Sequence, residues 1–375
     1  MNAVAPGVRD DTLATMDLAI VGLPQSGKTT VFKALTGGHG SASADGRGES
    51  VGAVKLPDDR LYRLAALVKA KKITPIEVFL HDLPALFQRG AAPSGPAGET
   101  LARADALLHV VRAFDRPDVP HPSGSVDPGR DITEFDAELM LFDLGVVERR
   151  LEKLDITVRS GRPGEREAGE REIALLQRVK GVLEADKPLR NELTNPDDLR
   201  ALSNFGLLSL KPMLLLLNVG EDKVSEQAAI AAQAQEKYGG PKTRAAAICA
   251  KLEAELAELS PDEAAEFRLD LGAPAGGTEV VLEQARELLG LLTFFTAGEK
   301  DTRAWSLPVG GTALQAAGRI HTDIERGFIR AEVIDWQKLL ELGSHGEARK
   351  KGQLRQEGKT YVVQDGDVIN VLFNV

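Results

Sequence analysis

One stretch near the start of the chain constrains the fold more than any other. Residues 22–29 read Gly-Leu-Pro-Gln-Ser-Gly-Lys-Thr and fit the pattern G-x-x-x-x-G-K-[ST] without a mismatch. The apolar run Leu18–Val21 before it predicts a buried strand, and Val31–Thr36 after it predicts a helix. Such a glycine loop points its backbone N–H groups at phosphates, and the start of the helix adds a positive dipole end. We therefore expect an α/β domain built around a phosphate-binding loop.

The side chains of this loop suit a nucleoside triphosphate with Mg²⁺. We expect Lys28 to reach the β- and γ-phosphates in catalysis, and the Thr29 hydroxyl to hold Mg²⁺. Asp82, at the end of the next predicted strand, is the second candidate magnesium residue, or else an ordinary polar residue at a strand end. The expected nucleotide contacts of the loop are Gly22, Pro24, Gln25, Ser26, Gly27, Lys28, Thr29 and Thr30.

A second candidate region follows the apolar run from Met213 to Leu217. Asn218 ends this run at the rim of the predicted sheet, where a nucleotide base would lie. A guanine-binding motif reads Asn-Lys-x-Asp, whereas here Val219 replaces the lysine and Glu221 the aspartate. Glutamate is one methylene longer, and an asparagine side chain can pair with adenine N6 and N7. The residues leave ATP and GTP both open, with a plain strand-to-helix turn as the alternative.

Charge and composition limit the partners. The 375 residues include 46 Lys and Arg against 56 Asp and Glu, a formal net charge of −10. This balance disfavours binding of nucleic acid through global charge, so no DNA partner is expected and any RNA contact needs a local patch. Two basic runs are candidates, residues 69–72 and the cluster at 349–359, with solvated surface as the alternative.

The chain has one cysteine, Cys249, so it forms no internal disulfide. Its apolar runs fall far short of the ~20 residues of a membrane helix. The N-terminus carries acidic residues and lacks an apolar signal region. We expect no membrane association and a cytoplasmic location.

Patterns along the chain predict four parts. Residues 1–15 form a flexible tail, and 16–131 with 206–300 form the phosphate-loop domain, in which strands and helices alternate. Residues 132–205 form an inserted helical hairpin, because two amphipathic helices flank a break at 160–164. Residues 301–375 form a small α+β module with a helix near 335–342. Within it, 361–363 and 368–373 flank a Gln-Asp-Gly-Asp turn and predict a β-hairpin.

These pieces, in this order, resemble the YchF/Obg-like ATPase family of translation-factor-class P-loop NTPases. The resemblance covers nearly the whole chain and includes the segments GLPQSGKTT, LPDDRL, HVVRAF, LLLLNVGE and ICAKLEAELAEL. Three C-terminal segments are closest, and look like the family's TGS domain, a ubiquitin-like β-grasp module: LLGLLTFFTAGEKDTRAW, LQAAGRIHTDIERGFIRAEVI and EGKTYVVQDGDVINVLFNV. The helical hairpin matches the family's inserted coiled coil in position.

The resemblance implies an ATPase or GTPase associated with the ribosome or RNA through the TGS domain and the hairpin. The family's Asn-x-x-Glu motif, which favours ATP, corresponds to Asn218 and Glu221. Its base loop corresponds to Cys249, Ala250 and Lys251, with the backbone N–H of Ala250 approaching the base. An apolar residue, here Leu86, stands where classical GTPases place a water-orienting glutamine.

Three departures from the family fall on the switching segments. No threonine occurs between Thr36 and Thr74, where switch I would supply one. The family's Asp-x-Ala-Gly reads Asp82-Leu-Pro-Ala85, so the N–H that senses the γ-phosphate comes from Ala85 without glycine's conformational freedom. Residues 89–104 look shortened. Two hypotheses follow: a slow, ATP-preferring NTPase, or a nucleotide-binding or ribosome-interacting module with impaired catalysis.

Overall fold

The computed structural model describes residues 15–38, 40–41, 49–84, 95–160, 162–273 and 276–374. These residues fall into two units. The larger unit comprises Asp17–Ala53 and Leu80–Leu288, and the smaller comprises the described residues up to Met16, Val54–Phe79 and the chain from Leu289 onward. Of the predicted tail, residues 1–14 lie outside the described residues.

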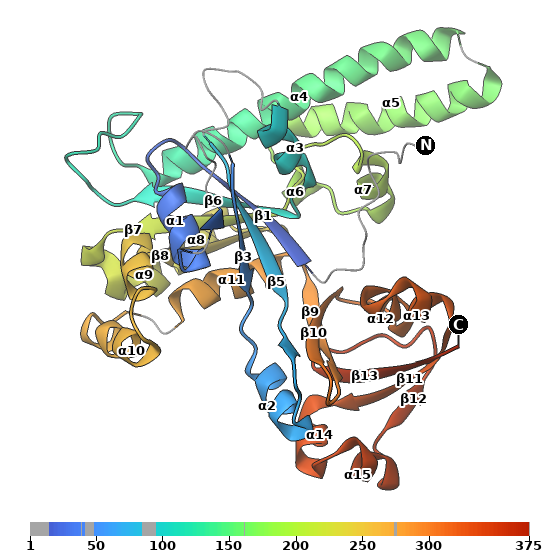
Figure 1. The fold of residues 1–375 in the computed structure, drawn as a ribbon. Helices are drawn as coiled ribbons and strands as arrows, with labels where there is room; N and C mark the ends of the chain where they lie inside the picture. Colours follow the sequence, from blue (N-terminus) through green and yellow to red (C-terminus); the bar gives the residue numbers. More distant parts are fainter. Residues whose placement is uncertain are drawn as a thin grey trace, which may run out of the picture. The chain divides into compact units, whose positions relative to one another are not determined.

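The larger unit is built on a seven-stranded sheet, and Figure 1 shows its strands beside the helices that follow them. The neighbouring pairs β1–β6, β6–β7 and β7–β8 are parallel, and β2–β3 is antiparallel. In spatial order the strands are β2 (Gly40–Ser41), β3 (Ser50–Lys55), β5 (Glu77–Asp82), β1 (Thr15–Val21), β6 (Ala106–Ala113), β7 (Met213–Val219) and β8 (Thr243–Ile248).

Helices of this unit complete an α/β fold, which confirms the predicted class. They are α1 (Lys28–Thr36), α3 (Gly95–Arg103), α4 (Pro128–Ser160), α5 (Pro163–Glu184), α6 (Leu189–Glu192), α7 (Pro196–Leu202), the 3₁₀ helix η1 (Glu221–Glu226), α8 (Gln227–Tyr238), α9 (Ala250–Leu256), α10 (Pro261–Asp270) and α11 (Gly277–Leu288). Every residue of β7 is buried, as expected for a parallel strand covered on both faces. One core cluster joins Leu107 of β6 and Leu215 of β7 to Phe135 near the start of α4.

The helices α4 and α5 form the predicted hairpin, seen as two long neighbouring helices in Figure 1. Pro163 occupies the first turn of α5, where its missing N–H costs nothing. The two helices share an apolar core that includes Val147, Leu176 and Val179. The Arg150 side chain pairs with Glu172 across the hairpin at 2.6 Å. The apolar periodicity of the sequence therefore located this element correctly.

The smaller unit is built on a six-stranded sheet with helices packed around it. In spatial order its strands are β12 (Arg355–Glu357), β11 (Phe328–Asp335), β13 (Asp367–Phe373), β9 (Leu291–Ala297), β10 (Thr302–Pro308) and β4 (Ile73–Thr74). Its helices are α2 (Asp59–Val68), α12 (Ala313–Ile320), α13 (Thr322–Arg326), α14 (Trp336–Leu342) and α15 (His345–Lys350). The predicted helix near 335–342 is present as α14, and the core contains Phe294, Trp305 and Val333.

The predicted hairpin between 361–363 and 368–373 is wrong. β13 pairs with β11 and β9, and residues 361–363 form no strand with it. Instead the Val363 N–H donates to Gly311 and the Ala313 N–H donates to Tyr361. The turn itself exists, because the Asp367 carboxylate accepts the Gln364 N–H at 2.8 Å. The turn signal was correct, but the preceding chain pairs elsewhere.

Two segments lie in a different unit from the predicted one. Residues 54–79 belong to the smaller unit, although the sequence placed them in the phosphate-loop domain. β9 was placed with 206–300, yet it pairs along its whole length with β10. Apolar residues of β9 complete the core of the six-stranded sheet, which a boundary at 301 would divide.

Among the described residues, every helix is too short or too polar to cross a membrane.

Candidate nucleotide site

The glycine loop between β1 and α1 has a backbone that only its glycines allow. Gly22 and Gly27 have φ of 141° and 95°. A Cβ at Gly22 would lie 2.4 Å from the Val110 carbonyl oxygen, and one at Gly27 would lie 2.2 Å from Asn218 Nδ2. Gln25 also has a positive φ, 63°, and is exposed on the turn beside Pro24. The loop is therefore tightly curled and packed against β6 and β7.

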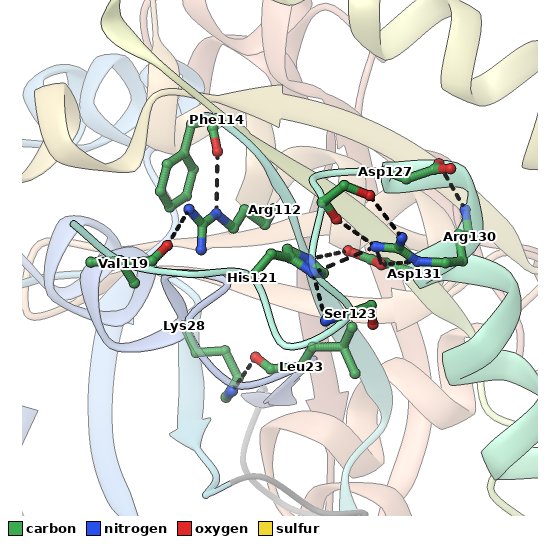
Figure 2. A network of polar contacts seen from close by, with 11 residues as sticks. Leu23, Lys28, Arg112, Phe114, Val119, His121, Ser123, Asp127, Arg130 and Asp131 are labelled. Carbon is green, nitrogen blue, oxygen red and sulfur yellow. Dashed lines mark hydrogen bonds and ion pairs between the residues drawn. The ribbon is translucent and has the colours of Figure 1, made fainter. Parts of the chain in front are cut away.

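Lys28 folds back over this loop. Its ammonium donates to the carbonyl oxygens of Gly22 and Leu23, each at 3.0 Å, and Figure 2 shows it beside Leu23. Burial lowers the pKa of Lys28, and the nearby charge of Asp82 opposes that shift. The Ser26 hydroxyl is buried and has no hydrogen-bond partner among the described residues. The loop thus gathers a cation and a polar group without a protein acceptor, a donor set that suits an anion.

Thr29 and Asp82 lie together at the ends of α1 and β5. The Thr29 hydroxyl donates to Asp82 Oδ2 at 2.8 Å. Burial raises the pKa of Asp82, and the hydrogen bond from Thr29 and the charge of Lys28 oppose that rise. Adjacent ligands of octahedral Mg²⁺ lie about 3 Å apart, so these two oxygens fit one edge of its coordination sphere. The described residues contain no cluster of three or more His, Cys, Asp or Glu for a metal, so water and phosphate would supply the other ligands.

Asn218 joins the glycine loop to the start of α9. Its Nδ2 donates to the Ser26 carbonyl at 3.0 Å, and its Oδ1 accepts the Ala250 N–H at 3.1 Å. The sequence predicted that the Ala250 N–H would approach the base. In the structure that N–H is taken by Asn218, because α9 begins at this residue and its first N–H groups have no partner within the helix. Asn218 therefore links two loops, and base pairing by its amide stays a prediction.

Glu221 and Lys251 face each other across the same region. Their side chains form an ion pair at 3.0 Å, and Lys251 also lies 3.9 Å from Glu255. Cys249 is 1% exposed, and burial raises the pKa of its thiol. The thiol is therefore mainly protonated at neutral pH.

A cavity of about 570 Å³ opens beside these groups. Of the predicted site residues it is lined by Gly27, Thr30, Asn218, Glu221, Cys249 and Lys251. Sequence reasoning did not name the other lining residues as site residues: Phe114, Asp115, Arg116, Val219, Gly220 and Asp222. Residues 114–116 directly follow β6, and ligands of open α/β sheets bind at the carboxyl ends of strands. That rule could have found them.

The segment after β6 is held by buried polar side chains (Figure 2). The Arg112 guanidinium donates to the carbonyls of Phe114 at 3.2 Å and Val119 at 2.9 Å. Further along, His121 lies 2.8 Å from Asp131 and accepts the Ser123 N–H at Nδ1, which leaves the proton on Nε2 to face the carboxylate.

Ala85 and Leu86, the predicted γ-phosphate sensor and the apolar replacement for glutamine, lie outside the described residues, as do residues 89–94 of the segment predicted to be shortened.

The sheet order, the glycine loop and the cavity at the strand ends define a P-loop nucleotide hydrolase. The chain is 38% identical over 365 residues to the protein named ribosome-binding ATPase YchF of Bacillus subtilis (strain 168), covering 95% of this chain and 98% of that protein. It is 37% identical over 366 residues to its namesake from Escherichia coli O157:H7, with the same shares covered. The chain belongs to the YchF family.

Two further comparisons agree. The solved structure of the Schizosaccharomyces pombe YchF GTPase matches with a TM-score of 0.81 and 28% identity, covering 95% of this chain and 97% of that one. The family model YchF-GTPase_C, described as a protein of unknown function (DUF933), matches residues 291–374.

Proposed function

We propose that this chain binds ATP with Mg²⁺, hydrolyses it slowly and couples the nucleotide state to binding of the ribosome. The observation that carries the proposal is the link made by Asn218, which joins the glycine loop to the wall of the cavity. Phosphates on the loop and a base in the cavity would then belong to one ligand. The names of the relatives, which are ribosome-binding ATPases, support the same activity.

Each predicted residue has a separate task in this proposal. The backbone of the glycine loop and Lys28 would bind the phosphates, and Lys28 would stabilise charge that develops on them in the transition state. Thr29 and Asp82 would hold Mg²⁺, which when bound neutralises phosphate charge. The Ala85 N–H would face the γ-phosphate, as the family pattern implies.

The ion pair of Glu221 favours adenine over guanine. A guanine-reading carboxylate accepts from the base N1–H and amino group, whereas Glu221 already pairs with Lys251 at 3.0 Å. Breaking the ion pair to bind guanine would offset part of the free energy gained from the new hydrogen bonds to the base. ATP is therefore the proposed nucleotide, with GTP as the weaker ligand.

Ribosomal RNA is the proposed contact of a basic surface at residues 69–72. Lys69, Lys71 and Lys72 are exposed and form no ion pair within the described part of the chain. In contrast, Arg349 pairs with Glu332 and Lys350 pairs with Glu347. The second predicted basic cluster, at 349–359, is thus partly neutralised by its own acids. Phosphate binding needs unpaired cations, so the first run is the better candidate.

A catalytically impaired nucleotide-binding module is the second candidate. The three departures in the switching segments favour it, because they leave the glycine loop intact and alter residues expected at the γ-phosphate. Such a module would bind ADP and ATP alike.

The rate of phosphate release distinguishes the slow ATPase from the catalytically impaired binding module. We expect the purified protein with Mg²⁺ and ATP to release phosphate slowly, and faster when ribosomes are added. Absence of release above a Lys28→Ala control in both conditions would reject hydrolysis and leave the binding module.

Co-sedimentation with ribosomes tests the basic surface. A variant with Lys69→Asn, Lys71→Ser and Lys72→Ser should lose binding at about 100 mM salt, where phosphate contacts still dominate affinity. The matched control carries Arg349→Ser, Lys350→Ser and Arg355→Ser, and should still sediment with ribosomes. Equal binding by both variants would remove residues 69–72 from the interface.

A further inference from the structure

Arg112 is a buried cation that binds main-chain carbonyls instead of a carboxylate. It is the last residue but one of β6 and is 2% exposed. No Asp or Glu lies within ion-pair distance of it in the regions that the structure describes. A buried guanidinium normally requires an acidic partner. Its position beside the cavity therefore calls for a specific explanation.

Among the described residues, the side chain of Arg112 donates hydrogen bonds only to one short segment, residues 114–119 (Figure 2). Its Nε donates to the Phe114 carbonyl at 3.2 Å, and its Nη2 donates to Val119 at 2.9 Å and to Arg116 at 3.4 Å. The guanidinium carbon also lies 4.7 Å from the centre of the Phe114 ring. One side chain thus fixes both ends of this segment.

That segment forms one wall of the cavity. Phe114, Asp115 and Arg116 all line it. Asp115 and Arg116 are exposed, and within the described ranges Arg116 forms an ion pair only with Asp118, which is also exposed. Exposed surface pairs of this kind add little order. Arg112 is therefore the main buried anchor of this wall.

The sheet places Arg112 directly beside Asn218. The two residues are partners in the parallel register of β6 and β7. Asn218 binds the carbonyl of Ser26 and the N–H of Ala250, and Arg112 binds the 114–119 segment. Two adjacent side chains at the carboxyl edge of the sheet thus fasten three separate loops around one cavity.

We propose that Arg112 is a positioning residue that holds the base-side wall of the nucleotide site and thereby sets the affinity for the nucleoside part of the ligand. This inference rests on the proposed function. The planar fork of arginine can donate to carbonyls at two positions while stacking on Phe114, whereas a lysine ammonium cannot do both. Arg112→Lys keeps the charge and loses the fork, so it isolates positioning from electrostatics.

Arg190 supplies a matched control. It is also 2% exposed and in the larger unit, but its guanidinium binds Asp136 and Thr243, and it does not line the cavity. Arg190→Lys should lower stability through the same loss of fork geometry without altering the wall.

The experiment compares binding of ATP with binding of inorganic tripolyphosphate, which can occupy the glycine loop but has no nucleoside. In Arg112→Lys we expect the Kd for ATP to rise about tenfold, the effect of losing one or two charge-assisted hydrogen bonds. The Kd for tripolyphosphate should stay within about twofold, because the phosphate side and the charge are retained. Arg190→Lys should leave both values within about twofold of the native protein.

Amide hydrogen exchange gives a readout that does not depend on the ligand. The amides of residues 114–116, 118 and 119 should exchange faster in Arg112→Lys and at the native rate in Arg190→Lys. If the lysine variant folds poorly, Arg112→Gln takes its place, with the same expectation that ATP loses more affinity than tripolyphosphate.

Three outcomes would overturn the inference. They are an unchanged Kd for ATP in Arg112→Lys, an equal loss for ATP and tripolyphosphate, or equal losses in the Arg112 and Arg190 variants. If the native protein binds neither ligand, the proposed function itself fails. If the native protein binds ATP and the Arg112 variant binds it equally well, only the proposed role of Arg112 is rejected.

Discussion

The phosphate side and the base side of the site are assembled in different ways. On the phosphate side, Lys28 and Thr29 come from one continuous motif, and they bind groups of the chain itself. On the base side, residues from three distant segments surround an open cavity, and Asn218 and Arg112 hold those segments through backbone groups. The difference teaches that, in the proposed function, a contiguous motif would position the phosphates, while residues at the strand ends would position the rest of the ligand.

The largest expected effect lies on the phosphate side. Lys28→Ala removes the ammonium over the loop, so we expect ATP hydrolysis to fall by about 100-fold or more, as for other groups that stabilise transition-state charge. Lys33→Ala is the control, since Lys33 is an exposed lysine on the same helix. Initial rates of phosphate release measure both. If the Lys28 variant were as active as the Lys33 variant, the Lys28 ammonium would have no role in hydrolysis.

More of the residues on the phosphate side than on the base side could be predicted from the sequence. The loop and Thr29 could be found because the motif is contiguous, and Asp82 because it follows the apolar run of the next predicted strand. Phe114 and Arg112 could not be found from spacing alone, since they lie about a hundred residues from Asn218 and only the pairing of β6 with β7 brings them together. For the same reason, the sequence assigned the Ala250 N–H to the base, although Asn218 takes it.

The fold was predicted correctly where it depends on local sequence patterns, and incorrectly where it depends on pairing between distant segments. Local patterns located the helices α4 and α5 and the break between them. The hairpin at 361–373 failed because its turn chemistry is local, while the partner of residues 361–363 lies some fifty residues earlier, at 311–313.

The second prediction tests whether the base side depends on Asn218. Asn218→Ala deletes two hydrogen bonds that hold the glycine loop and α9 in place, each contributing about 1 kcal/mol. If their whole energy serves the bound conformation, the Kd for ATP rises by about 30-fold at most, and we expect a rise of about tenfold or more. Calorimetry measures the affinity, and Asn204→Ala, at an exposed position of the same unit, is the control. An unchanged affinity in Asn218→Ala would show that the two sides work independently.

A third prediction concerns Cys249 in the cavity wall. Because burial raises the pKa of this thiol and limits access to it, we expect iodoacetamide to label it about tenfold or more slowly than a free thiol at pH 8. The rate should increase with pH, with a midpoint above the ~8.5 of free cysteine, because only the thiolate reacts. Bound ATP should slow labelling further. A midpoint at or below that of free cysteine would contradict the described burial.

The smallest effect is expected for the exposed ion pair at the cavity rim. Lys251→Ala frees Glu221 from its partner, but both side chains are more than half exposed, so screening by solvent limits the loss. We expect the Kd for ATP to change by about twofold and the preference for ATP over GTP to narrow by a similar factor. Parallel titrations with both nucleotides measure the change. A tenfold change in the Kd for ATP would show that the exposed pair of Glu221 and Lys251, rather than the buried strand ends, determines base recognition.

Titration of the native protein with ATP, ADP, GTP and GDP in the presence of Mg²⁺ tests the central claim most directly. The account predicts saturable one-to-one binding, with ATP bound more tightly than GTP and with both lost in Lys28→Ala. Absence of binding by all four nucleotides, or binding that Lys28→Ala leaves intact, would contradict it.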